Sequence, residues 1–122
     1  MDRLPLQGAR VVDLTWVGAG PYGTMLLGFL GAEVIKIESA QRLDSARGGF
    51  YKKWKSPIPP SFNDLNLNKH SLTVNLALPE GIALIKELAR VSDAVADTFR
   101  PGVTKHLGLD YAVHIHTPLM HL

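Results

Sequence analysis

The sequence predicts an α/β fold, a Rossmann-like parallel sheet with flanking helices. Residues 10–38 read as a strand, a glycine-rich turn, a short helix and a second strand. The alternation continues with apolar strand patterns at 71–76 and 94–99, separated by a helical pattern that opens at Pro79. Strands that alternate with helices are joined by right-handed crossovers, which makes their sheet parallel.

The turn after the first strand contains Gly18, Gly20 and Gly23, which match the pattern GxGxxG, and Glu38 closes the second strand. In dinucleotide-binding proteins such glycines let the backbone approach a pyrophosphate. The helix that follows offers unpaired N–H groups, and the acid accepts a hydrogen bond from a ribose hydroxyl. The alternative is that Gly20 and Gly23 only allow the helix to pack closely on the sheet.

A long irregular stretch, residues 39–68, separates the second strand from the third. Loops of this length inside compact domains are usually functional or disordered. Its first half is basic, with Asp44 as the sole acid among five cations: Arg42, Arg47, Lys52, Lys53 and Lys55. Two interpretations remain open, a solvated loop or a basic flap that meets a phosphorylated ligand.

The second half of the chain supplies the remaining elements. Residues 71–76 alternate apolar and polar side chains, as a half-buried strand does. Residues 79–81 open a helix, 94–99 form a fourth strand and 103–107 a helical turn. The helix has an apolar face made of Ile82, Ile85, Leu88 and Ala89.

The topology predicts where a ligand binds. Open parallel sheets bind ligands beyond the carboxyl ends of their strands. In this chain those ends are residues 16–20, 38–39, 76–77 and 98–102. We therefore expect these four segments to line one crevice.

Composition narrows the classes of function. At 122 residues the chain fits one domain, and the absence of cysteine excludes disulfides, thiolate metal ligands and a thiol nucleophile. A net charge of +2 gives no argument for a nucleic-acid partner. Neither a signal-like N-terminus nor a run of roughly 18 apolar residues for a membrane span is visible. The cytoplasm is the simplest location.

Five sequence blocks occur in a fixed order: LQGARVVDLT, AGPYGTMLLGFLGAEVIKIE, NLNKHSLTVNL, PEG and FRPGVTKHLGLDY. Together they resemble the opening of the class III CoA-transferases, the carnitine-dehydratase and bile-acid-inducible type. The resemblance implies that residues 1–113 are the N-terminal part of a nucleotide-binding domain whose sheet is larger in the family. It also implies enzymes that move coenzyme A from an acyl-CoA to a carboxylic acid and work as interlocked homodimers.

The resemblance also implies a set of coenzyme A contacts. They are Gly18, Ala19, Ser39, Val74, Asn75, Leu76, Ala77, Thr98, Phe99, Arg100 and His106. Oxalate-type members instead carry Gln for Gly18, Arg for Ser39, Lys for Ala77, Asn for Thr98 and Arg for His106.

These differences remove cations from the expected phosphate contacts. A diphosphate and a 3′-phosphate need cationic partners. We expect them from Arg100 or from the basic loop, especially Arg47, with Arg42 and Lys52 as further candidates. Lys69 is open to a structural interpretation.

No catalytic residue is assigned within the chain. The resemblance implies an aspartate nucleophile beyond the residues present, which forms a mixed anhydride and then a thioester with coenzyme A. Residues 114–122 form an atypical tail that carries His114, His116 and His121. The motif HxH can bind a metal, but an accidental cluster at a truncated or frame-shifted end is the favoured interpretation, so no metal is expected.

Three functions therefore remain. The leading one is the N-terminal part of a CoA-transferase, which contributes part of the coenzyme A site and has an acyl-CoA and a carboxylic acid as substrates. The second is a small NAD- or FAD-binding domain, although PEG and FRPG have no role in the dinucleotide fingerprint. The third is a non-catalytic remnant.

Overall fold

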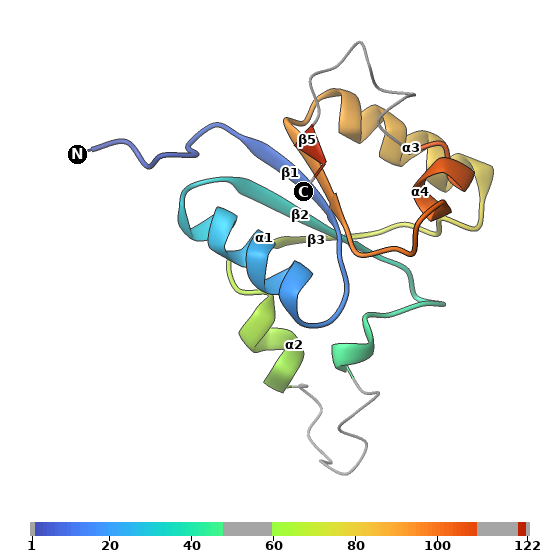
Figure 1. The fold of residues 1–122 in the computed structure, drawn as a ribbon, viewed down its shortest axis with the longest axis horizontal. Coiled ribbons are helices and arrows are strands. Elements are labelled where there is room, and N and C mark those ends of the chain that lie inside the picture. The colour runs from blue at the N-terminus through green and yellow to red at the C-terminus, as the bar shows by residue number, and fades with distance from the viewer. Residues whose placement is uncertain (1, 48–59, 110–119, 122) are drawn as a thin grey trace.

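The computed structural model describes residues 2–47, 60–109 and 120–121. In these residues five strands form one parallel sheet in the order β3-β2-β1-β4-β5 (Figure 1). The strands are β1 (Arg10–Leu14), β2 (Glu33–Glu38), β3 (His70–Thr73), β4 (Ala94–Asp97) and β5 (Met120–His121). The helices are α1 (Ala19–Phe29), the 3-10 turn η1 (Ser45–Arg47), α2 (Pro60–Leu65), α3 (Pro79–Arg90) and α4 (Val103–His106). The predicted fold class is confirmed.

Side-chain alternation along the strands divides the core between the two faces of the sheet. On the face covered by α3, Val12 and Leu14 pack with Ile85 of that helix. On the face covered by α1, Val11 and Val34 pack together. Figure 1 shows α1 and α3 on opposite sides of the sheet. The sheet is thus buried on both faces, as parallel sheets require.

The predicted third and fourth strands are too long. Strand β3 ends at Thr73 because the Asn75 side chain accepts a hydrogen bond from Ala77 N at 3.0 Å, and the Asn75 carbonyl accepts one from Leu78 N at 3.2 Å. This turn leads directly into Pro79 at the start of α3, a position that suits proline because its missing N–H is not needed there.

Two further expectations need correction. The stretch 39–68 is not irregular throughout, because η1 and α2 lie within it, while residues 48–59 lie outside the described part. The fifth strand, β5, was not predicted and lies within the segment 114–122 that was interpreted as a tail.

Helix α1 packs very closely against the carboxyl ends of the strands. A Cβ atom at Gly20 would lie 2.5 Å from Thr98 Cγ2 and 2.7 Å from Thr15 Cβ. At Gly23 a Cβ atom would meet nothing within 4 Å. The packing interpretation of the glycine motif therefore holds for Gly20 and not for Gly23.

This contrast can be measured with two matched variants. We expect Gly20→Ala to lower the free energy of unfolding by about 1 to 3 kcal/mol, because the new methyl group overpacks the contact with Thr15 and Thr98. Gly23→Ala should raise it by about 0.5 to 1 kcal/mol, because alanine favours the helix and meets no neighbour. Urea unfolding followed by circular dichroism gives both values, and equal effects of the two variants would contradict the packing argument.

Candidate functional site

The segments that follow β1, β2, β3 and β4 lie at one edge of the sheet, because the strands run parallel. The chain order reverses at β1, and such switch points are where open α/β sheets bind ligands. The positions that the sequence assigned to coenzyme A come from these segments: Gly18 and Ala19 after β1, Ser39 after β2, 74–77 after β3 and 98–100 after β4. His106 lies farther along the chain, on α4.

These positions differ in what they offer a ligand. Val74 is buried in the core, and Leu76 and Phe99 pack against it, so all three offer a ligand mainly backbone groups. Ser39 is buried, and Asn75 forms the turn before α3. The exposed positions are Gly18, Ala19, Ala77, Thr98, Arg100 and His106.

The turn between β1 and α1 has an unusual backbone. Val17 and Gly18 have φ values of 44° and 75°, and a left-handed conformation is costly for a β-branched residue such as valine. Gly18 is the N-cap of α1 and provides no side-chain hydrogen bond. The amide groups of the first turn therefore have no cap from this residue, and the helix dipole favours an anion there.

A chain of contacts links the ends of β1, β2 and β4. Trp16 N donates to Thr98 Oγ1 at 2.9 Å. The guanidinium carbon of Arg42 lies 5.0 Å from the centroid of the Trp16 ring. Arg42 N in turn donates to Ser39 Oγ at 3.0 Å. Two predicted contact positions, Ser39 and Thr98, are thus connected through Trp16 and Arg42.

A buried ion pair lies beneath this edge, on the α1 face of the sheet. Lys36 Nζ lies 3.0 Å from Asp44 Oδ2, and both side chains are almost fully buried. Lys36 also donates to the carbonyl of Thr15 at 2.8 Å. Asp44 Oδ1 accepts hydrogen bonds from Ala46 N at 2.9 Å and Val17 N at 3.3 Å. The pair therefore joins the loop after β2 to the turn after β1.

A second ion pair, between Arg47 and Glu38, shows that two predictions are wrong. Arg47 donates to both carboxylate oxygens of Glu38, with Nη2 2.7 Å from Oε1 and Nε 2.9 Å from Oε2. Asp44 N also donates to Glu38 Oε2, at 2.9 Å. Because Glu38 is buried and bonded to these groups, the prediction that it binds a ribose hydroxyl is wrong. Arg47, which also stacks on the Phe62 ring, is likewise not a free phosphate ligand.

The same contacts shift both pKa values. Burial alone would raise the pKa of Glu38, but the hydrogen bonds from Arg47 and Asp44 N outweigh it and hold this pKa below its ordinary value. The hydrogen bond to Glu38 raises the pKa of Arg47.

A third pair fixes α1 and the segment before β3. Lys69 Nζ lies 2.8 Å from Asp13 Oδ2, and both side chains are buried. Thr24 Oγ1 of α1 donates to the same oxygen at 2.7 Å, and Thr15 N donates to Asp13 Oδ1 at 2.9 Å. Burial lowers the pKa of Lys69, against the opposing effect of Asp13. Lys69 therefore has the structural role that the sequence left open.

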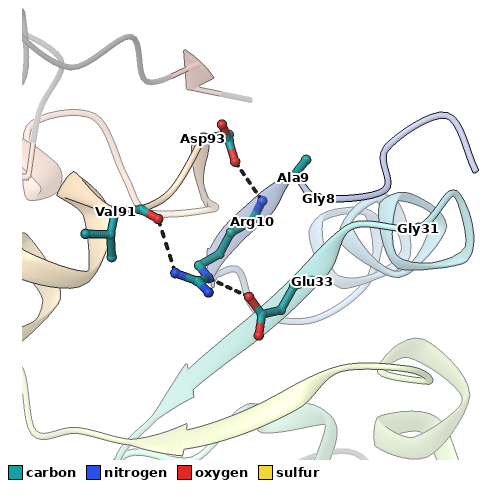
Figure 2. Close-up of a pocket in the computed structure, with 7 residues that line it drawn as sticks. All are labelled: Gly8, Ala9, Arg10, Gly31, Glu33, Val91 and Asp93. Atoms are coloured by element: carbon teal, nitrogen blue, oxygen red, sulfur yellow. Dashed lines mark hydrogen bonds and ion pairs between the residues drawn. The ribbon is translucent and has the colours of Figure 1, made fainter.

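A cavity of about 330 Å³ lies at the opposite edge of the sheet, where β1 and β2 begin (Figure 2). Arg10 donates through its side chain to Glu33 and to the carbonyl of Val91, and through its backbone to Asp93. Because these charged groups bind one another and lie away from the switch point, we do not assign the ligand site to this cavity.

Within the described residues, no group of three or more His, Asp or Glu side chains could hold a metal, and His114 and His116 lie outside those residues. None of the helices in the described part is long and apolar enough to cross a membrane.

Sequence reasoning placed Trp16 in a segment that lines the crevice but did not predict its contacts with Thr98 and Arg42. It missed Asp44 as a buried ion-pair partner. One signal was available: Lys36 and Glu38 alternate with apolar residues in a strand that a parallel sheet buries on both faces. Buried charges require partners, so these two positions predicted a pairing. The identity of the partners depends on the path of the loop.

Comparisons with known proteins agree with the resemblance. The family model of CoA-transferase family III matches residues 6–116 of the chain. Succinyl-CoA:glutarate CoA-transferase from Mus musculus is 41% identical over 111 residues, covering 88% of this chain and 24% of the relative. Acetyl-CoA:oxalate CoA-transferase from Acetobacter aceti is 38% identical over 107 residues, covering 88% and 27%. The chain spans about a quarter of the length of these curated relatives.

Solved structures of other proteins resemble this chain in fold as well. A CAIB/BAIF family protein from Brucella suis superposes with a TM-score of 0.85 at 32% identity, covering 98% of this chain and 33% of that one. A hypothetical protein from Mycobacterium tuberculosis gives a TM-score of 0.83 at 34% identity, with 96% and 32% covered.

The Glu38 contacts predict how stability depends on pH. A carboxyl whose pKa is lowered by folding stabilises the protein above its ordinary value of 4.5, and this contribution is lost as the pH falls through the folded-state pKa. We expect Glu38→Gln to lower the free energy of unfolding at pH 7 by about 1 to 3 kcal/mol and to flatten its decline below pH 4.5. The exposed Glu87→Gln is the control. Urea unfolding across this pH range would contradict the argument if Glu38→Gln kept the wild-type slope.

Proposed function

The chain belongs to CoA-transferase family III, and from this premise we propose that residues 1–113 are the N-terminal part of the coenzyme A-binding domain of an acyl-CoA:carboxylate CoA-transferase. The observation that carries the proposal is the gathering of the expected contact positions after four parallel strands at the switch point of the sheet. Strand β5 pairs with β4 in the same sheet, so we propose that the segment 114–122 is joined to this part through that strand.

The start of α1 is the proposed contact for the coenzyme A diphosphate. Gly18 and Ala19 are exposed residues at the N-terminus of a helix of 11 residues, where the cap provides no side-chain hydrogen bond, and the amide groups of such a helix start bind phosphate oxygens. Thr98 and Ser39 flank this turn on either side. The remaining proposed contacts are 74–77, Phe99, Arg100 and His106.

The proposed reaction moves coenzyme A between two carboxylic acids. The relatives named above are a succinyl-CoA:glutarate and an acetyl-CoA:oxalate CoA-transferase, so an acyl-CoA and a free carboxylate are the proposed substrates. The proposed setting is the cytoplasm, and the proposed assembly of the whole protein is a homodimer.

We place the nucleophilic carboxylate of the whole protein outside residues 1–122. Asp13 and Asp44 are buried in ion pairs. Asp93 Oδ2 accepts from Arg10 N at 2.8 Å, and Asp97 Oδ1 accepts from Phe99 N at 3.0 Å. These four carboxylates have structural partners, which supports a chain that binds coenzyme A and does not form the covalent intermediate.

Binding can be tested with a variant that spares the fold. We expect calorimetry to show that the chain binds coenzyme A more tightly than NADH. Ala19→Asp should weaken coenzyme A binding by about tenfold or more, because a carboxylate repels the diphosphate, while the melting temperature stays equal or rises because an acid suits a helix N-terminus. Ala83→Asp, on the exposed side of α3, is the control. Tighter binding of NADH would favour a dinucleotide-binding domain, and binding of neither ligand would favour a non-catalytic remnant.

Acyl exchange is a separate prediction. Incubation of the chain with labelled coenzyme A and a panel of acyl-CoAs should give no exchange above background, since a missing nucleophile leaves little activity. Exchange that disappears when one of the aspartates present is replaced by asparagine would contradict the proposal.

A further inference from the structure

Trp16 and Arg42 form a stacked pair at the carboxyl edge that the sequence did not predict. The guanidinium carbon of Arg42 lies 5.0 Å from the Trp16 ring centroid, within the range of a cation–π contact. Trp16 is the second residue after the end of β1 and precedes the Val17–Gly18 turn, so the pair lies next to the start of α1.

Both members of the pair are held by the ends of β2 and β4, the two strands that flank β1. Arg42 N donates to Ser39 O at 3.2 Å and to Ser39 Oγ at 3.0 Å, which ties the arginine to the end of β2. Trp16 N donates to Thr98 Oγ1 at 2.9 Å, which ties the tryptophan to the end of β4. The guanidinium is therefore positioned before any ligand arrives, and less side-chain entropy is lost on binding.

Three other cations of the described residues near this edge are bound to carboxylates, whereas Arg100 after β4 is exposed. Lys36 pairs with Asp44, Lys69 with Asp13 and Arg47 with Glu38. Arg42 is exposed, and no carboxylate of the described residues forms an ion pair with it. Its guanidinium lies over the indole and donates no hydrogen bond to another described residue, an arrangement suited to bidentate binding of a phosphate.

Coenzyme A carries two separate phosphate groups, and the edge offers two separate anion-binding features. The start of α1 suits the diphosphate, while Arg42 lies on the adjoining loop after β2. We propose that Arg42, positioned by Trp16, binds the 3′-phosphate of coenzyme A and makes the site prefer coenzyme A over its dephospho form. This inference rests on the proposed function and assigns to Arg42 a role that Arg47 cannot take, because Arg47 is bonded to Glu38.

The test compares coenzyme A with dephospho-coenzyme A in calorimetric titrations of the whole chain. We expect wild type to bind coenzyme A about tenfold or more tightly than the dephospho form. Arg42→Gln should remove this preference by weakening coenzyme A binding alone, and Arg42→Lys should keep part of it. Arg90→Gln, an exposed arginine at the end of α3, is the matched control and should leave both affinities unchanged. Melting temperatures verify that each variant is folded.

The outcomes separate this inference from the proposed function. If wild type binds both ligands equally, or Arg42→Gln keeps the preference, the inference is overturned while coenzyme A binding stands. If Arg42→Gln lowers the affinity for coenzyme A and for dephospho-coenzyme A equally, the inference is also overturned, because the arginine would then contact the diphosphate. Failure of wild type to bind either ligand overturns both. A second readout is the emission of Trp16 in a Trp54→Phe background, which should change more with coenzyme A than with the dephospho form.

Discussion

Burying a charged side chain is costly unless it is paired and hydrogen-bonded, and this constraint shapes the carboxyl edge of the sheet. The α1 face of the sheet is apolar at one end, where Val11 and Val34 pack. Farther along the same strands it carries Asp13, Lys36 and Glu38, all buried. Lys36 lies opposite Asp13 in the register of β1 and β2, but the residue that forms an ion pair with each of the three comes from outside the sheet.

The partners come from the segments that follow the strands, so pairing the charges also positions the site. Asp44 meets Lys36, and Arg47 meets Glu38, which draws the loop after β2 against the sheet. Lys69 meets Asp13 from the segment before β3. The exposed Arg42 belongs to the loop that is fixed in this way. A buried layer of ion pairs therefore supports an exposed layer of groups available to a ligand.

The buried layer of ion pairs also contacts the unusual turn after β1. Val17 has a left-handed backbone, which is costly for a branched side chain, and its amide donates to Asp44. Strained residues persist where their surroundings hold them, and they occur often at ligand sites. Close contact of Gly20 with Thr15 and Thr98 brings α1 onto the strand ends beside this turn. The helix start, the strained turn and the buried pairs are thus parts of one arrangement.

Local patterns in the sequence determined the first four strands of the sheet, α1, α3 and the family, because strand alternation, helical periodicity and ordered sequence blocks are properties of neighbouring residues. They also identified the carboxyl edge, since parallel topology alone places the strand ends together. The tertiary structure decided which charges pair and which remain available. Asp13 and Lys69 are 56 positions apart and Trp16 and Thr98 82 apart, and Glu38 was predicted to bind a ribose although Arg47 occupies it. Such contacts depend on the path of the loops in space, which no local pattern encodes.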